Sequence, residues 1–437
     1  MTPPTPASGL LLAGLLCSPV ALAAPEMTIT DAIRTAWTHD ARLQASSAQA
    51  TSASRSAEAA DWALGPTVVL GAQGTITSQP SRHFALLLDQ GQLTAADFDP
   101  ARLNTPSVRG SLGLSAVVEQ PLIDPGLWAA SRRAHAGAEA EEAGRAVTQA
   151  RVALETVRAY FSVRAAEEAL VFAEDALRAA RDTERFLRAR VEQDVLLASE
   201  GSRSTAYRAQ AEAERAAAVR QLALARTGFV MLVGQDPAPG MLVTPLVPPE
   251  TAVSAEVQER PEARAARAAV DAQAAAADEA HGRLWPTLLL QGGVATERAG
   301  LSEGTTWGMG FLILRWRGSV AGFKMADAAE STRVAAEARR LEQERMLAAE
   351  LEQARASLDA AAAALQAART AVAASEQTRT LRQARHRQGL IPLTELLDAE
   401  TGLTSARALL LRSALQARLA RAELENASGQ AVEGVRP

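Results

Sequence analysis

The stretch LGPTVVLGAQGTITS, residues 64–78, recurs later in the chain as LWPTLLLQGGVATER, residues 284–298. Each copy follows an alanine-rich stretch typical of a helix, and each has a proline, Pro66 or Pro286, that ends that helix. Apolar and polar side chains then alternate, as in a strand with one apolar face. Copies 220 residues apart indicate a duplicated unit of domain size rather than a short repeat.

The sequence around each copy predicts the same order of elements. In the first half we expect a helix, a strand, a loop, a second strand, a very long helix, a break and a returning helix: 27–63, 67–77, 78–109, 111–120, 127–193, 194–201 and 202–233. In the second half we expect the corresponding helices and strands at 262–283, from 287, at 307–314, at 326–387 and at 393–427.

Downstream of the second strand the offset between the halves falls to 195 residues, so that Gly113 matches Gly308 and Gly234 matches Gly429. The first half therefore contains 25 extra residues, all in the loop 78–109 between its two strands. Insertions are tolerated best at such hairpin tips.

The long helices exceed what a globular core can cover, because about 65 helical residues extend roughly 100 Å. Apolar residues keep a heptad pattern that is interrupted at Glu184 and that favours a coiled coil. Taken by itself, the helix is most simply interpreted as part of an ordinary long coiled coil. The heptad positions are Leu170, Ala173, Leu177, Ala180, Leu187 and Val191.

The chain starts with residues 1–23, whose short apolar run and Ala21-Leu22-Ala23 cleavage site are typical of a secretory signal peptide. Cleavage there removes Cys17, the single cysteine, and excludes disulfide or thiol chemistry in the mature chain. We find no later apolar run near 18 residues and expect no transmembrane helix. We divide the mature chain into a first repeat, 24–240, a proline-rich connector, 241–261, and a second repeat, 262–437.

Four strands of about ten residues match the length that crosses an outer membrane. Four strands are too few to close a barrel, and open strand edges are not tolerated in lipid. If these strands enter the membrane, they must therefore be completed by other copies of the chain, two copies giving 8 strands and three giving 12.

Tryptophan supports this interpretation, because five of the six lie at strand ends or helix–strand junctions. Tryptophans in such places are typical of the aromatic belts at membrane interfaces, although junction aromatics also fill packing gaps. The five are Trp62, Trp128, Trp285, Trp307 and Trp316.

In its duplicated element order the chain resembles the TolC family of outer-membrane efflux channels. The resemblance is carried by Pro66 and Pro286, by QPLIDPG at 120–126, and by RQGLIPLTELLDAETGL at 387–403. It implies a mainly helical homotrimer in which a 12-stranded barrel continues into a tunnel of long helical hairpins. Its implied partners are outer-membrane lipid, a periplasmic adaptor (membrane fusion) protein and an inner-membrane pump.

The resemblance also implies a gate at the tunnel entrance, where its acidic pair corresponds to Glu395 and Asp398. A spacing of three places both on one helix face, and three copies would give two acidic rings that favour cations. They also suit an ordinary acidic helix start. His386 and Ile391 stand beside Gly389 where family members carry a tyrosine and an arginine, so the locking bonds differ, and His386 is a candidate for pH sensitivity.

Exposed breaks between the long helices and the returning helices are expected to dock the adaptor, with a plain helix-hairpin turn as the alternative. The candidate residues are Gln193, Asp194, Glu200 and Gly201 in the first half and Gln388, Ile391 and Pro392 in the second.

No enzyme is indicated, because the five histidines are scattered and no phosphate loop, HExxH motif or nucleophile elbow is present. We expect no cofactor and no metal, and a net charge of −5 gives no reason to expect nucleic-acid binding. The predicted function is the exit duct of a tripartite efflux pump. A duct for type I protein secretion and a soluble periplasmic coiled-coil adaptor are the alternatives.

Overall fold

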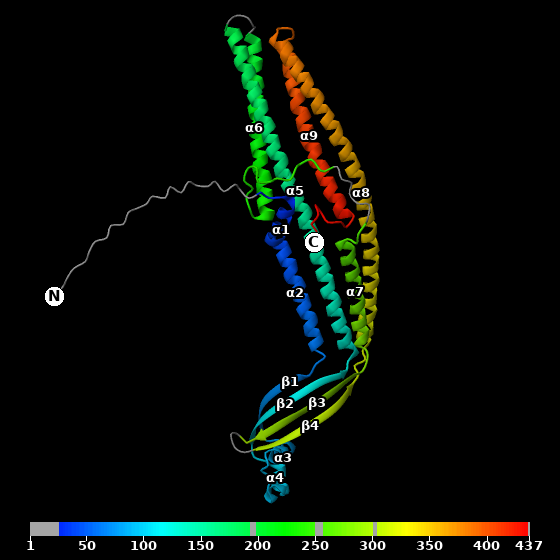
Figure 1. Cartoon of the computed structure of the whole chain (residues 1–437). Coiled ribbons are helices and arrows are strands. Elements are labelled where there is room, and N and C mark those ends of the chain that lie inside the picture. The colour runs from blue at the N-terminus through cyan, green and yellow to red at the C-terminus, as the bar shows by residue number, and fades with distance from the viewer. Residues whose placement is uncertain (1–25, 193–197, 250–256, 300–303, 436–437) are drawn as a thin grey trace, which may run out of the picture.

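The computed structural model describes residues 26–192, 198–249, 257–299 and 304–435. The predicted signal peptide, Gln193 and Asp194 therefore lie outside the described residues. The molecule is elongated, with paired long helices at one end and a single sheet at the other (Figure 1).

The first half contains α1 (Ile29–His39), α2 (Ala41–Trp62), β1 (Thr67–Thr77), α3 (Pro80–Asp89), the 3₁₀ helix η1 (Ala95–Phe98), α4 (Pro100–Asn104), β2 (Arg109–Ile123), α5 (Pro125–Glu192) and α6 (Ala198–Val233). The second half contains α7 (Pro261–Gly282), β3 (Thr287–Arg298), β4 (Gly304–Arg315), α8 (Val320–Arg387) and α9 (Leu393–Ala427).

Two of the differences between predicted and observed elements have a clear local cause. The helix expected over 27–63 is two helices, because Asp40 has extended backbone and its carboxylate caps α2 by accepting from the N–H groups of Arg42 and Leu43. The second strand does not stop at Pro121 but continues to Ile123, with a register irregularity between Pro121 and Ile123. In both cases a local feature, the Asp40 cap or the irregular strand register, changes the element that hydrophobic periodicity and proline positions predict.

The four strands form one antiparallel sheet in the order β1-β2-β3-β4. The duplicated hairpins meet at the centre, where Ala116 of β2 pairs with Val294 of β3. The outer edges of β1 and β4 have no strand partner among the described residues. The sheet therefore presents two open edges, one from each half of the duplication.

The interruption of the heptad at Glu184 is a buried ion pair between α5 and α6. Glu184 lies on the seam with Leu177 and Leu187, and all three are buried. Its carboxylate is 2.9 Å from Arg208 Nε and accepts a hydrogen bond from Thr205 Oγ1 at 2.8 Å. The polar residue thus lies at a true heptad position, and its charge is compensated by the partner helix.

A compact core lies where α1, α5, α6 and α9 come together, midway along the molecule. Its fully buried aromatic residues Tyr160, Phe161 and Phe229 pack edge to face. The Tyr160 hydroxyl donates to the carbonyl of Met27 at 2.8 Å and accepts from the N–H of Thr244 at 3.0 Å. One side chain therefore fastens both the start of the chain and the connector to the long helix.

One described helix, the Ser199–Val233 part of α6, is long and apolar enough to cross a membrane by length and composition. We had expected no stretch of this length and apolar composition after the signal peptide, and that expectation was wrong. Its place is beside α5, to which it is joined by ion pairs of Arg215 with Glu174 at 3.1 Å and of Arg208 with Glu184. Its apolar residues are largely exposed in a single protomer.

Tyr160→Phe is expected to loosen the connector, because it leaves the half-buried Thr244 N–H without its partner and the Met27 carbonyl with only the N–H of Val243, at a cost of about 1–3 kcal/mol. Hydrogen exchange should show faster exchange of the Thr244 amide. The other tyrosine of the chain provides the control, because Tyr207→Phe lies on α6 and should leave that amide protected. Equal protection of Thr244 in both variants would contradict the role given to Tyr160.

Candidate functional site: membrane sheet, tunnel entrance and hairpin groove

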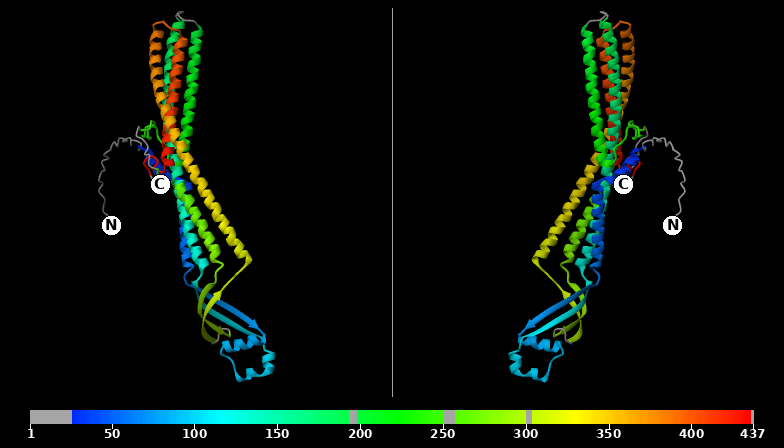
Figure 2. Two further views of the ribbon diagram at one scale, coloured as in Figure 1. Left: turned by 90° about the vertical axis from the view of Figure 1, so that its right-hand side faces the viewer. Right: turned by 90° about the vertical axis from the view of Figure 1, so that its left-hand side faces the viewer.

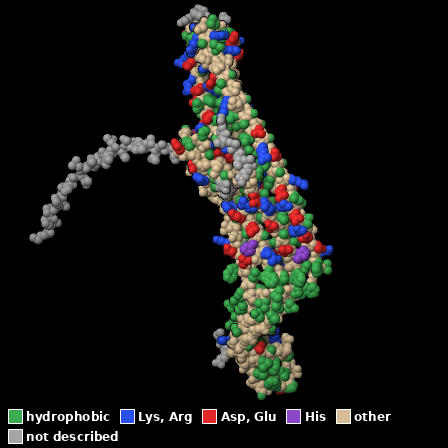
Figure 3. All heavy atoms as spheres, turned by 45° about the vertical axis from the view of Figure 1, so that its right-hand side comes forward, with side chains coloured by type: hydrophobic (Ala, Val, Ile, Leu, Met, Phe, Trp, Pro, Cys, Tyr) green, Lys and Arg blue, Asp and Glu red, His purple; other side chains and the backbone are tan. Residues whose placement is uncertain are grey.

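The sheet has one face that is almost entirely apolar and open to its surroundings. The register aligns on this face Val68, Leu70, Ala116, Val118, Leu290, Val294, Leu312 and Leu314. Leu70, Ile76 and Leu314 are 72–81% exposed. Figure 3 shows apolar side chains gathered over the sheet, with charged side chains concentrated on the helices. An apolar patch of this extent on strands of membrane-spanning length is typical of a lipid-facing surface.

The opposite face of the sheet is polar over β1 to β3. Its side chains include Gln73, Ser115 and Glu297, and Gln291 donates to the Glu119 carboxylate at 3.1 Å across the β2–β3 pair. The strand β4 adds Trp307, Met309, Phe311 and Ile313 to this same face. Such a face suits the lining of a water-filled channel with an apolar segment along one strand.

Four of the five predicted belt tryptophans lie together where the helices meet the sheet. Trp62 ends α2, Trp128 lies in the first turn of α5, Trp285 precedes β3 and Trp316 follows β4, and all four are 44–80% exposed. Trp307 differs, because it lies opposite Ala295 on the polar face. Since side chains alternate along a strand, Trp307 lies on the opposite face of the sheet from the apolar residues, and its place in the belt remains a prediction.

The tunnel-entrance candidates lie in the turn that joins α8 to α9. Gly389 has a φ of 73°, which favours glycine, and its N–H donates to the His386 carbonyl at 2.9 Å. The N–H of Leu390 donates to the carbonyl of Arg385 at 3.0 Å, completing a Schellman cap. The glycine is thus required by the cap itself.

Glu395 and Asp398 lie on one exposed face of the first turns of α9, as predicted. Leu393, Leu396 and Ala399 occupy the opposite, buried face. Neither carboxylate has an ion-pair or hydrogen-bond partner among the described side chains. The pair is therefore open to ions or to an adjoining protomer.

Three side chains of α8 hold the start of α9, and sequence reasoning had identified only one of them. His386 Nδ1 is 3.1 Å from the Ile391 carbonyl, Arg382 donates to the Glu395 carbonyl at 2.9 Å, and Arg379 pairs with Glu400 at 2.8 Å. A carbonyl oxygen only accepts, so Nδ1 is the donor in the His386 bond. Pairing to backbone carbonyls has no sequence signal, which is why Arg382 was missed.

The docking candidates are only partly described. Gln388 caps α8, and Ile391 and Pro392 lie at the turn, where Leu390, which we had not singled out, is 68% exposed. We expected Glu200 and Gly201 in a break between helices. They lie instead in the first turn of α6, because that helix starts at Ala198. Docking at either tip remains a prediction.

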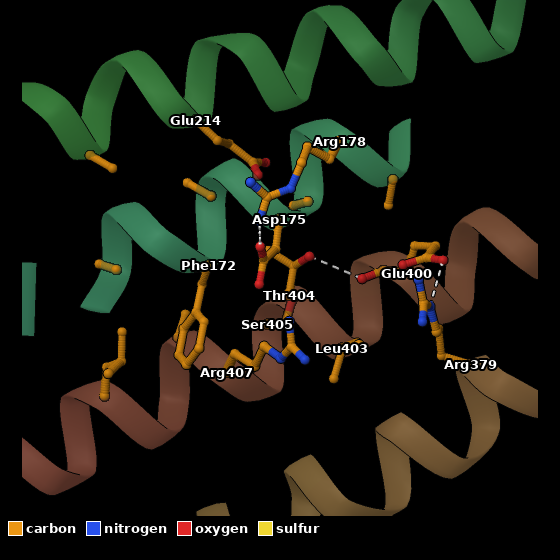
Figure 4. Close-up of a pocket in the computed structure, with 17 residues that line it drawn as sticks. Phe172, Asp175, Arg178, Glu214, Arg379, Glu400, Leu403, Thr404, Ser405 and Arg407 are labelled. Atoms are coloured by element: carbon orange, nitrogen blue, oxygen red, sulfur yellow. Dashed lines mark hydrogen bonds and ion pairs between the residues drawn. The ribbon is translucent and has the colours of Figure 1, made fainter. Parts of the chain in front are cut away.

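A groove lies between the two helical hairpins, α5/α6 and α8/α9 (Figure 4). Two adjoining cavities of about 590 and 420 Å³ share Ala179, Arg379 and Glu400. One end of the groove is closed by Arg407, whose guanidinium lies 5.2 Å from the Phe172 ring. Alanines of α5 make up much of its surface.

Three arginines that line the groove have ion-pair partners, two of them within the lining and the third, for Arg407, outside it. Arg178 pairs with Asp175, Arg379 with Glu400, and Arg407 with Glu376. Burial raises the pKa of the nearby Tyr207 hydroxyl, and the Glu400 carboxylate raises it further. A groove with paired charges and small apolar residues suits packing against a helix better than binding a charged small molecule.

The arrangement defines a class of protein in which a small membrane-spanning sheet continues into long helical hairpins. Residues 252–430 match the model of the family described as outer membrane efflux protein. The fold is similar to the Vibrio cholerae outer membrane protein VceC, with 19% identity, 92% of this chain and 96% of that chain covered, and a TM-score of 0.76. It is also similar to the Neisseria gonorrhoeae MtrE channel, with 19% identity, coverage of 94% and 90%, and a TM-score of 0.76.

A third similar structure, CusC, has 16% identity, 92% coverage of each chain and a TM-score of 0.74. No curated protein matches the chain by sequence. The predicted family resemblance, the mainly helical fold class and the outer-membrane location are thereby confirmed. The chain resembles the outer membrane efflux channels in fold from end to end, and in sequence over its second repeat.

Glu395→Gln combined with Asp398→Asn is expected to lower the preference of the open channel for cations, because it removes two unpaired carboxylates per protomer from the entrance. The measurement is the reversal potential in planar bilayers under a salt gradient. Glu342→Gln, an exposed acid on α8 far from the turn, is the matched control. The same reversal potential in all three proteins would remove these residues from the pore.

Proposed function

We propose that the protein is the outer-membrane exit duct of a tripartite efflux pump, through which small molecules leave passively. The observation that carries the proposal is the sheet, because it has an apolar exposed face, a polar face and two open edges of membrane-spanning length. The open edges are satisfied when β4 of one protomer pairs with β1 of the next. Three protomers then give 12 strands, as the family resemblance implies.

A homotrimer also accounts for the exposed apolar surface of α6. Leu224 and Met231 are 58% and 77% exposed and lie seven residues apart, on one face of the helix. Packing of this face against a neighbouring protomer removes it from water, with a gain of about 25 cal/mol per Å². In this assembly the Glu395 and Asp398 faces of three protomers meet around the entrance.

Entrance opening then takes place where the hairpins are least connected. The contacts of α5 with α9 lie mainly toward the centre of the molecule, where Arg158 pairs with Glu423 at 2.8 Å, and the groove separates the hairpins above them. The tip of α8 and α9 can therefore move without breaking the core. The adaptor, which connects to the inner-membrane pump, binds at this tip.

A duct for type I protein secretion uses the same architecture and differs in the pump that is joined to it. A soluble periplasmic adaptor is the alternative from another class, and the exposed apolar sheet argues against it. Cell fractionation separates the classes. A heat-modifiable trimer in the outer membrane fits a duct, and a soluble monomer contradicts the proposal.

Leu224→Asp combined with Met231→Asp is expected to prevent trimer formation, because it places two charges per protomer in an apolar interface. Semi-native gel electrophoresis of membranes should show the trimer band lost. Val108→Asp, which changes a 71% exposed residue outside the helical hairpins, is the control and should leave the trimer intact. A trimer in the double variant would mean that α6 lies outside the interface.

Leu390→Glu combined with Ile391→Glu is expected to reduce adaptor binding by tenfold or more, about 1.4 kcal/mol, because it replaces the apolar tip of the α8–α9 turn. Co-purification with the cognate adaptor and single-channel conductance should be measured together. The double substitution should lower co-purification with the adaptor and leave single-channel conductance unchanged. Leu88→Glu, an exposed leucine on α3 at the other end of the molecule, is the control. Undiminished co-purification would exclude this tip as a docking surface.

A further inference from the structure

The 25 extra residues of the first hairpin fold into a small ordered unit at the far end of the sheet. It contains α3, η1 and α4, which lie at the end of the sheet that is away from the helical hairpins (Figure 2). Leu86 and Leu87 are buried, and the rings of Phe84 and Phe98 pack edge to face at 5.8 Å. The insertion therefore has its own apolar contacts rather than being a passive surface loop.

The end of α3 is fastened to two strands that are not neighbours. Gln90 donates to the Gly110 carbonyl at 3.1 Å, and Arg109 donates to the Gln90 side-chain carbonyl at 2.5 Å, which joins α3 to β2. Thr305 of β4 donates to the carbonyl of Asp89. Because α3 starts directly after β1, the helix crosses from the first strand of the sheet toward the fourth.

The length of α3 fits this crossing. Its ten residues extend about 15 Å, and the first and fourth strands of a sheet are about 14 Å apart. A cavity of about 520 Å³ lies between α3 and the sheet. The sheet residues around it belong mainly to the polar face, among them Gln73, Thr75, Ser115 and Glu297, and α3 adds Arg82 and Asp89.

We propose that α3 narrows the extracellular mouth of the channel and that Arg82 and Glu297 set which ions and solutes leave. The inference rests on the proposed function, because the polar face lines a pore only when protomers close the ring. Twelve strands about 4.8 Å apart and tilted by about 40° close at a diameter of about 24 Å. Each α3 stands about 10 Å deep on that wall, so three copies leave a narrow central opening.

The first test removes the insertion from the full-length trimer. Residues 80–104 are replaced by a short Gly-Ser linker, and single-channel conductance is measured in planar bilayers. Conductance about twofold or more above that of the unmodified protein supports the proposal. Unchanged conductance of a correctly assembled trimer overturns it. If the unmodified protein forms no channel at all, it is the proposed function that fails.

The second test retains the insertion and changes its charge. It can therefore be carried out even if the deletion variant does not assemble. Arg82→Glu should shift the reversal potential toward cations, because it reverses a charge that lines the same cavity as Glu297 on the proposed exit path. Arg102→Glu in α4 makes the same change in net charge away from the cavity and should shift it little. Equal shifts in both variants, or none in either, overturn the role of Arg82.

Discussion

The open edges of β1 and β4 are the constraint on which the rest of the structure depends. A backbone N–H or carbonyl without a partner is costly in hydrocarbon, so a four-stranded sheet with an apolar exposed face is incomplete by itself. Both edges arise from the duplication, since β2 and β3 pair at the centre and leave one outer strand from each half. The need for further protomers is thus built into the topology of one chain.

The long helices transmit this arrangement away from the membrane, and the central core keeps them aligned. Tyr160 ties the start of the chain and the connector to α5, and the buried Arg260 pairs with Glu350 at 2.9 Å to fasten the start of α7 to α8. A buried guanidinium is stable only with such partners. Beyond the core a groove lies between the two hairpins.

The two halves of the duplication have diverged at opposite ends of the molecule. At the membrane end the first hairpin carries the α3 insertion across the polar face, where the second has only a short connection. At the far end the second hairpin carries Glu395 and Asp398 on an open helix face, and α8 side chains fasten its turn. In our proposals the exit element and the entrance element therefore belong to different halves of the duplication.

The sequence by itself determined the element order, the duplication, the apolar strand face and the acidic pair, because alternation, proline and glycine positions and repeat offsets are local properties. The break at Asp40 depends on an individual cap and was missed, and α6 already includes Ala198, earlier than predicted. Only the tertiary structure decided that Trp307 points to the polar face, that Glu184 is paired across α5 and α6, and that α3 crosses the sheet. These facts depend on which strands and helices face each other, and contacts between residues distant in sequence leave no mark on local periodicity.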